Sequence, residues 1–500
     1  MRRAMNVLEG SGPQETASDF HHPFDHPYFG QLFLAGIFKI IGYPDSLNPV
    51  EGDVNSIERL WLVPRILMGL LAVVDTFLIY KIAERRYNRN VAFIASILFA
   101  VMPLGWMVRN VFLESIQMPF LLTSIFLAVY YSCRHANKIS GRSNSNNFRQ
   151  KNDKDSNRNI KNTSLILLSG AFLGLAIFTK IPVFTMIPLV GFLIYTNSNR
   201  NLKSLGLWFI PVILIPLIWP IESIWQGQFE EWIHDALWQT TGRVDKGVFE
   251  VFKWLFQADP VLLVVGISGS IFAGLIKRDF LALIWLIPLV MLFHFLGYTQ
   301  PHFFIVALPA FCISGAILIG QVLSRIKNKK LQQVMSTAII SGVLIFGLAS
   351  TIVLISLSVN HSYFEAVAFV VHKAKDSSSN NDNSHNAVSI LGFPRAKSYL
   401  WIPKYIFDKD VRLVLFRNVE NIERLQVEKF IIITNNDLES YLSKEKNIQS
   451  GLSERIKTLY NDSETIVKFV TDNYNFGTYP YTNMKDNYAG LLRPVEIRAN

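Results

Sequence analysis

Cysteine is almost missing from this chain of 500 residues, and charged residues are scarce. The two cysteines, Cys133 and Cys312, fall at the end of one apolar run and inside another. They cannot meet from such positions, so a disulfide framework is excluded, and no zinc-type cysteine spacing exists. Charged residues make up only 17% of the chain. No basic domain with interleaved aromatic residues is present, which excludes a nucleic-acid partner.

The chain is rich in long hydrophobic runs. Half of the residues are hydrophobic, and the mean hydropathy is +0.27. The runs are apolar on all sides rather than amphipathic, which argues against a soluble helical core. Their lengths suit a hydrocarbon layer of about 30 Å. We predict ten membrane spans, near residues 60–82, 91–107, 111–131, 163–179, 182–196, 204–221, 260–276, 280–297, 303–323 and 334–357.

The basic residues indicate how these spans are oriented. The loops at 81–90, 132–162, 197–204, 277–279 and 324–333 together hold 20 lysines and arginines. The loops at 44–59, 108–110, 222–259 and 298–302 hold 5. Because basic loops stay in the cytoplasm, the first set is predicted to lie inside. Both termini then face outward, and the net charge of +10 is explained mainly by topology.

The composition divides the chain further. Residues 1–28 are predicted to be an extracytoplasmic loop. The apolar stretch 29–43 reaches only about 22 Å as a helix, which predicts an interfacial helix. The membrane domain covers residues 60–357. It includes a disordered cytoplasmic linker at 132–162, rich in Asn, Ser, Lys and Arg. It also includes an extracytoplasmic loop at 222–259, whose tryptophans predict helices on the membrane surface.

Residues 358–500 have the composition of a soluble domain. Short β-rich runs alternate with helical patterns, which predicts a small α/β domain outside the cell. The predicted strands are 387–393, 411–416, 429–434 and 465–470, and the predicted helices lie near 437–446 and 452–460. The expected fold is therefore an all-α polytopic membrane domain, with about ten transmembrane helices plus interfacial helices, followed by this α/β domain. The expected location is the plasma membrane, as an integral multi-pass protein.

Ionisable residues mark the outer ends of several spans. Arg109 and Glu114 lie between two apolar runs, where charge is costly and indicates function. Arginine can grip phosphate with two hydrogen bonds, and Glu114 can bind a sugar. Lys180 and His302 end or begin other runs and are candidates to contact a lipid phosphate. Structural alternatives remain for each residue, namely an Arg109–Glu114 ion pair and snorkelling of Lys180.

The N-terminal loop carries a second polar group. In Asp25-His26-Pro27, the acid or the imidazole could orient a sugar or serve as general base. Helix capping is the structural alternative. His21, His22 and His26 with Asp19 and Asp25 could bind a divalent metal, but the sequence fixes no ligand geometry, so no metal site is assigned. Asp75, deep within the first span, is interpreted as structural and needs a partner.

The order of these parts resembles a known family. Asp25-His26-Pro27-Tyr-Phe-Gly30 and the segment Val63–Gly69 resemble the loop and following helix of lipid-dependent membrane glycosyltransferases. Arg109 through Glu114 is similar to a segment in which the family has Arg and Asp. The stretch Gly170–Pro182 and the stretch His302–Pro309 resemble two further segments. The family is that of the dolichyl-phosphate-mannose protein mannosyltransferases and aminoarabinose transferases, with the GT-C fold. The resemblance covers about residues 25–320.

The resemblance implies transfer of a hexose-type, mannose-like sugar. The donor would be a polyprenyl or dolichyl phosphate, and the acceptor a protein, lipid or glycan at the outer face. His26, Arg109, Glu114, Lys180 and His302 are the substrate-binding candidates. Positive charge near the leaving phosphate would stabilise the transition state. The partners implied are the bilayer, the lipid-linked sugar and the acceptor, with no certain cofactor.

One family feature is absent from the sequence. Relatives have an Asp-Glu pair after a first transmembrane helix, with the aspartate as base, and no such pair is present here. The stretch Arg3–Gly10 resembles the end of the segment that follows the pair. We expect the first helix and the pair to lie upstream of Met1. Otherwise Asp25 or Asp19 would serve as base, or the chain would be inactive.

Two other classes of protein stay open. A transporter or flippase for a lipid-linked sugar would predict paired broken helices and internal repeats, and no repeat is evident in the sequence. A non-catalytic membrane protein would bind a partner through its outer domain. Oligosaccharyltransferase is a nearer alternative, but the Trp-Trp-Asp-Tyr-Gly signature is missing from the C-terminal residues.

Overall fold

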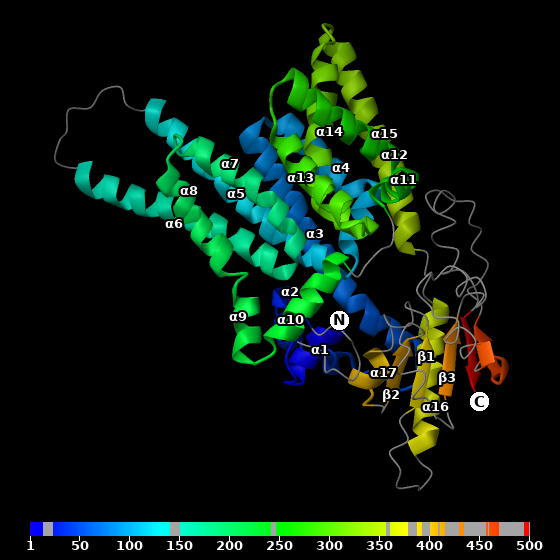
Figure 1. The fold of residues 1–500 in the computed structure, drawn as a ribbon. Coiled ribbons are helices and arrows are strands. Elements are labelled where there is room, and N and C mark those ends of the chain that lie inside the picture. Colours follow the sequence, from blue (N-terminus) through cyan, green and yellow to red (C-terminus); the bar gives the residue numbers. More distant parts are fainter. Residues whose placement is uncertain are drawn as a thin grey trace. The chain divides into compact units, whose positions relative to one another are not determined.

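The structure is a computed structural model in which helices form most of the chain and five strands lie in its last quarter (Figure 1). It describes residues 1–13, 24–140, 151–241, 247–356, 361–378, 388–392, 401–408, 411–415, 430–434, 457–458, 460–469 and 495–499. Contacts divide the chain into two compact units. The bundle unit comprises residues 24–30 and 65–355. The sheet unit comprises residues 1–23, 31–64 and 356–500.

The helices follow the order of the apolar runs. Short 3₁₀ segments and one π-helical turn (η4) are labelled η. The elements are α1 (Arg2–Leu8), α2 (Phe29–Ile41), η1 (Asp45–Leu47), α3 (Val54–Arg86), α4 (Arg89–Val101), η2 (Pro103–Arg109), α5 (Leu113–Ser140), α6 (Lys151–Thr179), η3 (Ile181–Met186), α7 (Ile187–Asn197), α8 (Leu202–Leu214), α9 (Ile218–Trp225), α10 (Phe229–Thr241), α11 (Val248–Ala258), α12 (Pro260–Ile271), η4 (Phe272–Ile276), α13 (Leu281–Leu296), η5 (Pro301–Ala307), α14 (Leu308–Ser324), α15 (Lys329–Ser356), α16 (His361–Ser378) and α17 (Trp401–Tyr405).

Each predicted span coincides with one helix or with two consecutive helices. Among the described residues, five helices are long and apolar enough to cross a membrane, and up to seven if each of two bent pairs is one span. The other three predicted spans correspond to shorter apolar helices at 163–179, 181–197 and 281–296. The prediction of a helical, multi-pass membrane protein is confirmed.

Two pairs of consecutive helices are sharply bent at a proline. α4 and η2 meet at an angle of 70°, and α11 meets the helix of α12 and η4 at 119°. Pro103 and Pro260 begin the second piece in each case, where a missing backbone N–H does no harm. Asp259 stabilises both bends, because its carboxylate accepts hydrogen bonds from Leu262 N (2.9 Å) and Leu104 N (3.3 Å). The carboxylate thus replaces hydrogen bonds that the broken helices lose.

Close helix packing within the bundle unit depends on small residues. Helices α5, α6, α7 and α8 run side by side (Figure 1). A Cβ on Gly170 would lie 2.2 Å from the carbonyl oxygen of Trp208, and one on Gly174 would lie 2.6 Å from that of Pro211. The Gly-x-x-x-Gly spacing on α6 therefore lets the backbone of α8 approach closely, as is typical of membrane helix pairs.

Segments that the sequence predicts to lie outside the spans also contain helices. The predicted linker 132–162 is helical where the structure describes it, because α5 continues to Ser140 and α6 begins at Lys151. Elongating a helix that an apolar segment has already nucleated costs little, and Lys and Arg are good helix formers. The stretch predicted as an interfacial helix forms α2, and the loop 222–259 contains α10 and α11. Their location at the membrane surface stays a prediction.

The sheet unit contains five strands in the order β2-β1-β3-β5-β4. The strands are β1 (Val388–Gly392), β2 (Val411–Leu415), β3 (Phe430–Thr434), β4 (Glu464–Phe469) and β5 (Val495–Ala499). β1 pairs in parallel with β2 and β3, whereas β5 runs antiparallel to β3 and β4. Helix α16 packs against β4 and β5, so the sheet and its helices confirm the predicted α/β fold. The predicted helix 437–446 and most of 452–460 lie outside the described residues.

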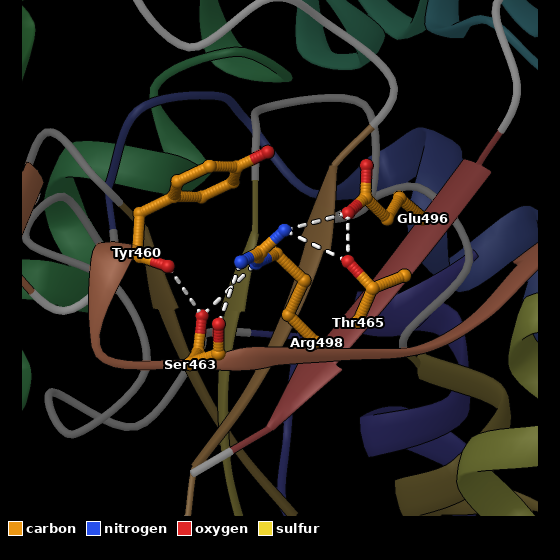
Figure 2. A network of polar contacts seen from close by, with 5 residues as sticks. All are labelled: Tyr460, Ser463, Thr465, Glu496 and Arg498. Atoms are coloured by element: carbon orange, nitrogen blue, oxygen red, sulfur yellow. Dashed lines mark hydrogen bonds and ion pairs between the residues drawn. The ribbon is translucent and has the colours of Figure 1, made fainter.

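A polar network ties β4 to β5 in this unit (Figure 2). The Arg498 guanidinium donates to Glu496 (2.7 Å), to Thr465 Oγ1 (2.8 Å) and to the Ser463 carbonyl (2.6 Å), and it lies 4.2 Å from the Tyr460 ring centroid. Burial alone would raise the pKa of Glu496. The hydrogen bonds from Thr465 and Arg498, together with the arginine charge, outweigh burial and lower that pKa below its ordinary value.

Candidate functional site

A buried ion pair lies where three helical segments of the bundle unit meet. Glu114 is in the first turn of α5, Lys180 joins α6 to η3, and His302 is in η5. Lys180 Nζ donates to Glu114 Oε1, and His302 Nε2 lies 3.9 Å from the same oxygen. The Lys180 and Glu114 side chains are 8% and 4% exposed. Three of the candidates predicted from sequence are thus brought together in space.

Aromatic rings enclose this pair. The Phe112 ring stacks on His302, with centroids 4.6 Å apart and planes 14° apart. The Lys180 ammonium lies 4.1 Å from the centroid of the Phe303 ring, within the range of a cation–π contact. Rings on two sides restrict water, which strengthens the electrostatic interaction between Lys180 and Glu114.

Gln117 fixes the relative position of the two charged residues, and our sequence reasoning did not identify it. Its side-chain Nε2 donates to the carbonyl oxygens of Ala176 (2.7 Å) and Lys180 (2.6 Å). The Ala176 carbonyl lies in the last turn of α6 and the Lys180 carbonyl directly follows it, so the Gln117 amide ties this helix end to α5. Gln117 is three residues after Glu114 and so shares its helix face. A second buried polar residue at that spacing was the available signal.

Arg109 does not pair with Glu114, contrary to the structural alternative considered for it. Its guanidinium Nη2 donates to the carbonyl oxygen of Ala100 (2.6 Å), at the end of α4. The helix that it ends, η2, packs against η5, which carries His302. Arg109 therefore stabilises the broken span and lies in an element that borders the site. The partner of Glu114 is Lys180, which is 66 residues away in sequence.

The loop with Asp25 and His26 packs beside the buried pair. Both residues are partly buried, and Pro27 next to them is fully buried. Gly30 makes the approach possible, because a Cβ there would lie 2.9 Å from the side chains of both Leu113 and Thr179. These two residues directly precede Glu114 and Lys180 in sequence. The loop is therefore held against the elements that carry the ion pair.

Two acids on helices α9 and α10 anchor the two ends of this loop. The Tyr28 hydroxyl donates to Glu222 on α9, and the Phe24 backbone N–H donates to Asp235 on α10 (2.8 Å). The Tyr28 ring also packs edge-on against Phe178, with centroids 4.9 Å apart. Helices α9 and α10 thus have a structural role that the surface-anchoring interpretation did not include.

The remaining polar candidates stand apart. Asp75 in α3 is fully buried, and within the described residues neither of its carboxylate oxygens has a hydrogen-bond partner. The partner expected for it is therefore not found in that part of the chain. Asp19, His21 and His22 lie outside the described residues. Among the residues that the structure describes, no three or more His, Cys, Asp or Glu side chains are grouped so that they could hold a metal ion.

Residues 31–230 match the model of the Alg9-like mannosyltransferase family. Similar solved structures include ArnT from Cupriavidus metallidurans bound to undecaprenyl phosphate, with 11% identity, a TM-score of 0.48, and coverage of 100% of this chain and 92% of that one. Another is the oligosaccharyltransferase AglB from Archaeoglobus fulgidus in complex with an inhibitory peptide and a dolichol-phosphate, with 10% identity and a TM-score of 0.49.

The coverage of these relatives differs. A second structure of the Archaeoglobus fulgidus enzyme, tethered to an acceptor peptide, has 10% identity and a TM-score of 0.48, and this chain spans 64% of its length. The alignment covers 88% of this chain. No curated protein matches the chain. The family match supports a membrane glycosyltransferase, and the resemblance to the GT-C membrane glycosyltransferases that the sequence motifs indicate is thereby confirmed.

Proposed function

We propose that the chain transfers a mannose-like hexose from a polyprenyl or dolichyl phosphate to a protein, lipid or glycan acceptor. The observation that carries the proposal is the buried Glu114–Lys180 pair, with His302 at 3.9 Å and the Asp25 loop beside it. A buried ammonium that a carboxylate holds in place is suited to a phosphate group. The match of residues 31–230 to a mannosyltransferase family supports the choice of sugar.

Some of the candidate residues act on the leaving phosphate, and others act on the acceptor hydroxyl. The acceptor hydroxyl oxygen attacks the anomeric carbon, and the bond from that carbon to the phosphate oxygen breaks with its electron pair on the phosphate. Lys180 and Arg109 stabilise the negative charge that develops there. Glu114 keeps Lys180 in position, and His302 and His26 contact the sugar or phosphate. The hydroxyl proton passes to a base, for which Asp25 is the candidate among the described residues.

The proposed topology places this chemistry on the outer face of the plasma membrane. It rests on the excess of lysine and arginine in the alternate loops, 20 against 5. The C-terminal α/β domain then lies outside the cell. Protease added to intact cells should therefore cleave the C-terminal domain and leave the loop 324–333 intact. Protection of that domain would contradict the topology without affecting the chemical assignment.

The decisive experiment measures release of polyprenyl phosphate by the purified full chain in nanodiscs. Mannosyl polyprenyl phosphate is the donor, and a membrane extract supplies acceptors. Removing one group that stabilises developing charge lowers turnover by about 10²–10³-fold, so Lys180→Met should do the same. Arg325→Ala, at the exposed end of α14, is the control for Arg109→Ala and should match the wild type.

Two results would contradict the proposal. Equal donor consumption by wild type and Arg109→Ala would remove the role of that arginine, and the same result for Lys180→Met would remove the site. Movement of the intact donor across the bilayer, with the sugar still attached, would instead indicate a flippase.

A further inference from the structure

A cavity with both polar and apolar walls lies in the bundle unit, lined by other residues than those of the ion-pair site. It measures about 790 Å³, within the range of about 300–1,000 Å³ that small-ligand sites occupy. Its walls come from the start of α4, the turn after η4, the end of α14 and the start of α15. These helix ends are joined by the loops 81–90, 277–279 and 324–333, all of which are predicted to be cytoplasmic. The cavity therefore opens at the face opposite to the one proposed for sugar transfer.

The cavity exists because two helices meet at one end only. Near the end of α4, Thr351 Oγ1 on α15 donates to the Val101 carbonyl (2.8 Å), and a Cβ on Gly347 would lie 2.7 Å from the Val101 side chain. Near the start of α4 the cavity separates these helices. Gly320 of α14 leaves further space, since a Cβ there would meet only Val91, at 3.8 Å.

The polar part of the lining is rich in side-chain amides. Within the described residues, the side chains of Gln321, Gln332 and Gln333 have no hydrogen bond, and Ser336 on the next turn of α15 also has none. An amide both donates and accepts hydrogen bonds, as does a hydroxyl group. The lining therefore suits a molecule with several hydroxyl groups.

The charge of the lining favours an anion. Asp279 is paired with Arg86 (3.2 Å), so its negative charge is balanced. Lys277 also lines the cavity, and it has no carboxylate partner in the described part of the chain. One cation thus remains without a counter-charge, where it can attract a phosphate.

The apolar part of the lining continues toward the lipid. Val91, Ile94 and Ile340 line the cavity together with Phe93, whose side chain is 53% exposed. Leu275 and Ile276, in the turn before Lys277, are about 70% exposed. In a membrane span, such exposed apolar side chains face acyl chains. A molecule can therefore place a polar head among the amides while its chains remain in the bilayer.

We infer that this cavity binds an anionic phospholipid whose head group carries free hydroxyls, with its phosphate at Lys277 and its hydroxyls on the glutamines of α14 and α15. Phosphatidylglycerol fits this description. Phosphatidylcholine does not, because its head group is cationic at the outer end and has no hydroxyl. The inference is independent of the sugar-transfer site, which the cavity does not share.

Lipid retention by the full chain tests the inference. The purified protein is exposed to an equimolar mixture of phosphatidylglycerol and phosphatidylcholine, and retained lipids are measured by native mass spectrometry. Wild type should keep phosphatidylglycerol preferentially. Gly320→Phe fills the cavity and should reduce this retention at least tenfold. Lys277→Gln removes one exposed cation and should reduce it about two- to fivefold.

Matched controls separate a site from a general effect. Gly206→Phe adds the same ring on α8, where Gly206 is exposed and has open space around it, and Lys203→Gln removes another exposed lysine. Both should retain phosphatidylglycerol as wild type does, and all four variants should consume the sugar donor normally.

Three outcomes would overturn the inference. Unchanged retention in Gly320→Phe would show that the cavity is not the site. Equal retention of phosphatidylcholine would remove the charge and hydroxyl selectivity. Full displacement of the lipid by glycerol 3-phosphate would show that a free phosphate ester, not a lipid, is the ligand.

Discussion

Removing the Lys180 ammonium tests the buried pair most directly. Lys180→Met keeps a side chain of similar length and leaves Glu114, which is 4% exposed, without its cation. Breaking a buried ion pair from one side costs about 3–5 kcal/mol of unfolding free energy, because a charge stays buried without a partner. We expect a loss near the lower end, about 3 kcal/mol. The reason is that His302 remains 3.9 Å from the carboxylate.

The double variant Glu114→Gln with Lys180→Met separates the charge from the packing. Both charges are then gone, so the unfolding free energy should return to within about 1 kcal/mol of the wild type. Unfolding in mixed micelles with increasing denaturing detergent measures this difference. Lys203→Met, an exposed lysine at the start of α8, is the control and should leave stability unchanged.

Stability and activity should respond differently to this pair of variants. If Lys180 binds the leaving phosphate, donor consumption stays low in the double variant although its stability recovers. Equal stability of the single and the double variant would refute the energetic reasoning. Recovery of full activity in the double variant would refute the catalytic role and leave a purely structural ion pair.

Three further predictions follow from single positions. Gly30→Ala should destabilise the protein by about 1–3 kcal/mol and lower donor consumption, because the new Cβ would lie 2.9 Å from Leu113; unchanged activity would show that the loop need not approach so closely. Asp75→Leu should raise the unfolding free energy by about 1–3 kcal/mol, since it removes a buried carboxylate without a hydrogen bond in the described residues, and a loss of activity would instead assign it a function. The lowered pKa of Glu496 means that its stabilising effect is present above the ordinary glutamate pKa and is lost as the pH falls through the folded-state value. The hydrogen-exchange protection factors of β4 and β5 should therefore fall in acid in the wild type and fall less in Glu496→Gln, and an equal fall in both proteins would contradict the reasoning.

Local patterns were sufficient to predict the helices of the membrane domain and four of the five strands. The apolar runs mark the helices because membrane spans need about 20 apolar residues in sequence. Four strands could be located from β-rich runs, at 387–393, 411–416, 429–434 and 465–470. The strand Val495–Ala499 was missed because Glu496 and Arg498 alternate with apolar residues in a very short segment, and their pairing partner is a distant strand.

The contacts within the candidate site depend on tertiary packing and were harder to predict from the sequence. Sequence reasoning selected Glu114, Lys180 and His302 as separate candidates, and their outer-end positions were the signal. It offered Arg109 as an ion-pair partner because of proximity in sequence, whereas the structure pairs Glu114 with Lys180. Which of two cations reaches a carboxylate depends on how α5 and α6 pack, and no local pattern encodes that.

The hydrogen bonds of Asp259 also constrain how the bundle can move. One carboxylate oxygen accepts a hydrogen bond from Leu262 N at one bend, and the other accepts from Leu104 N at the second bend. Neither bend can straighten by itself without giving up one of these bonds inside a region that offers little water in exchange. The two bends therefore act as one coupled hinge. Any rearrangement that shifts η2, and Arg109 at its end, must also displace the start of α12.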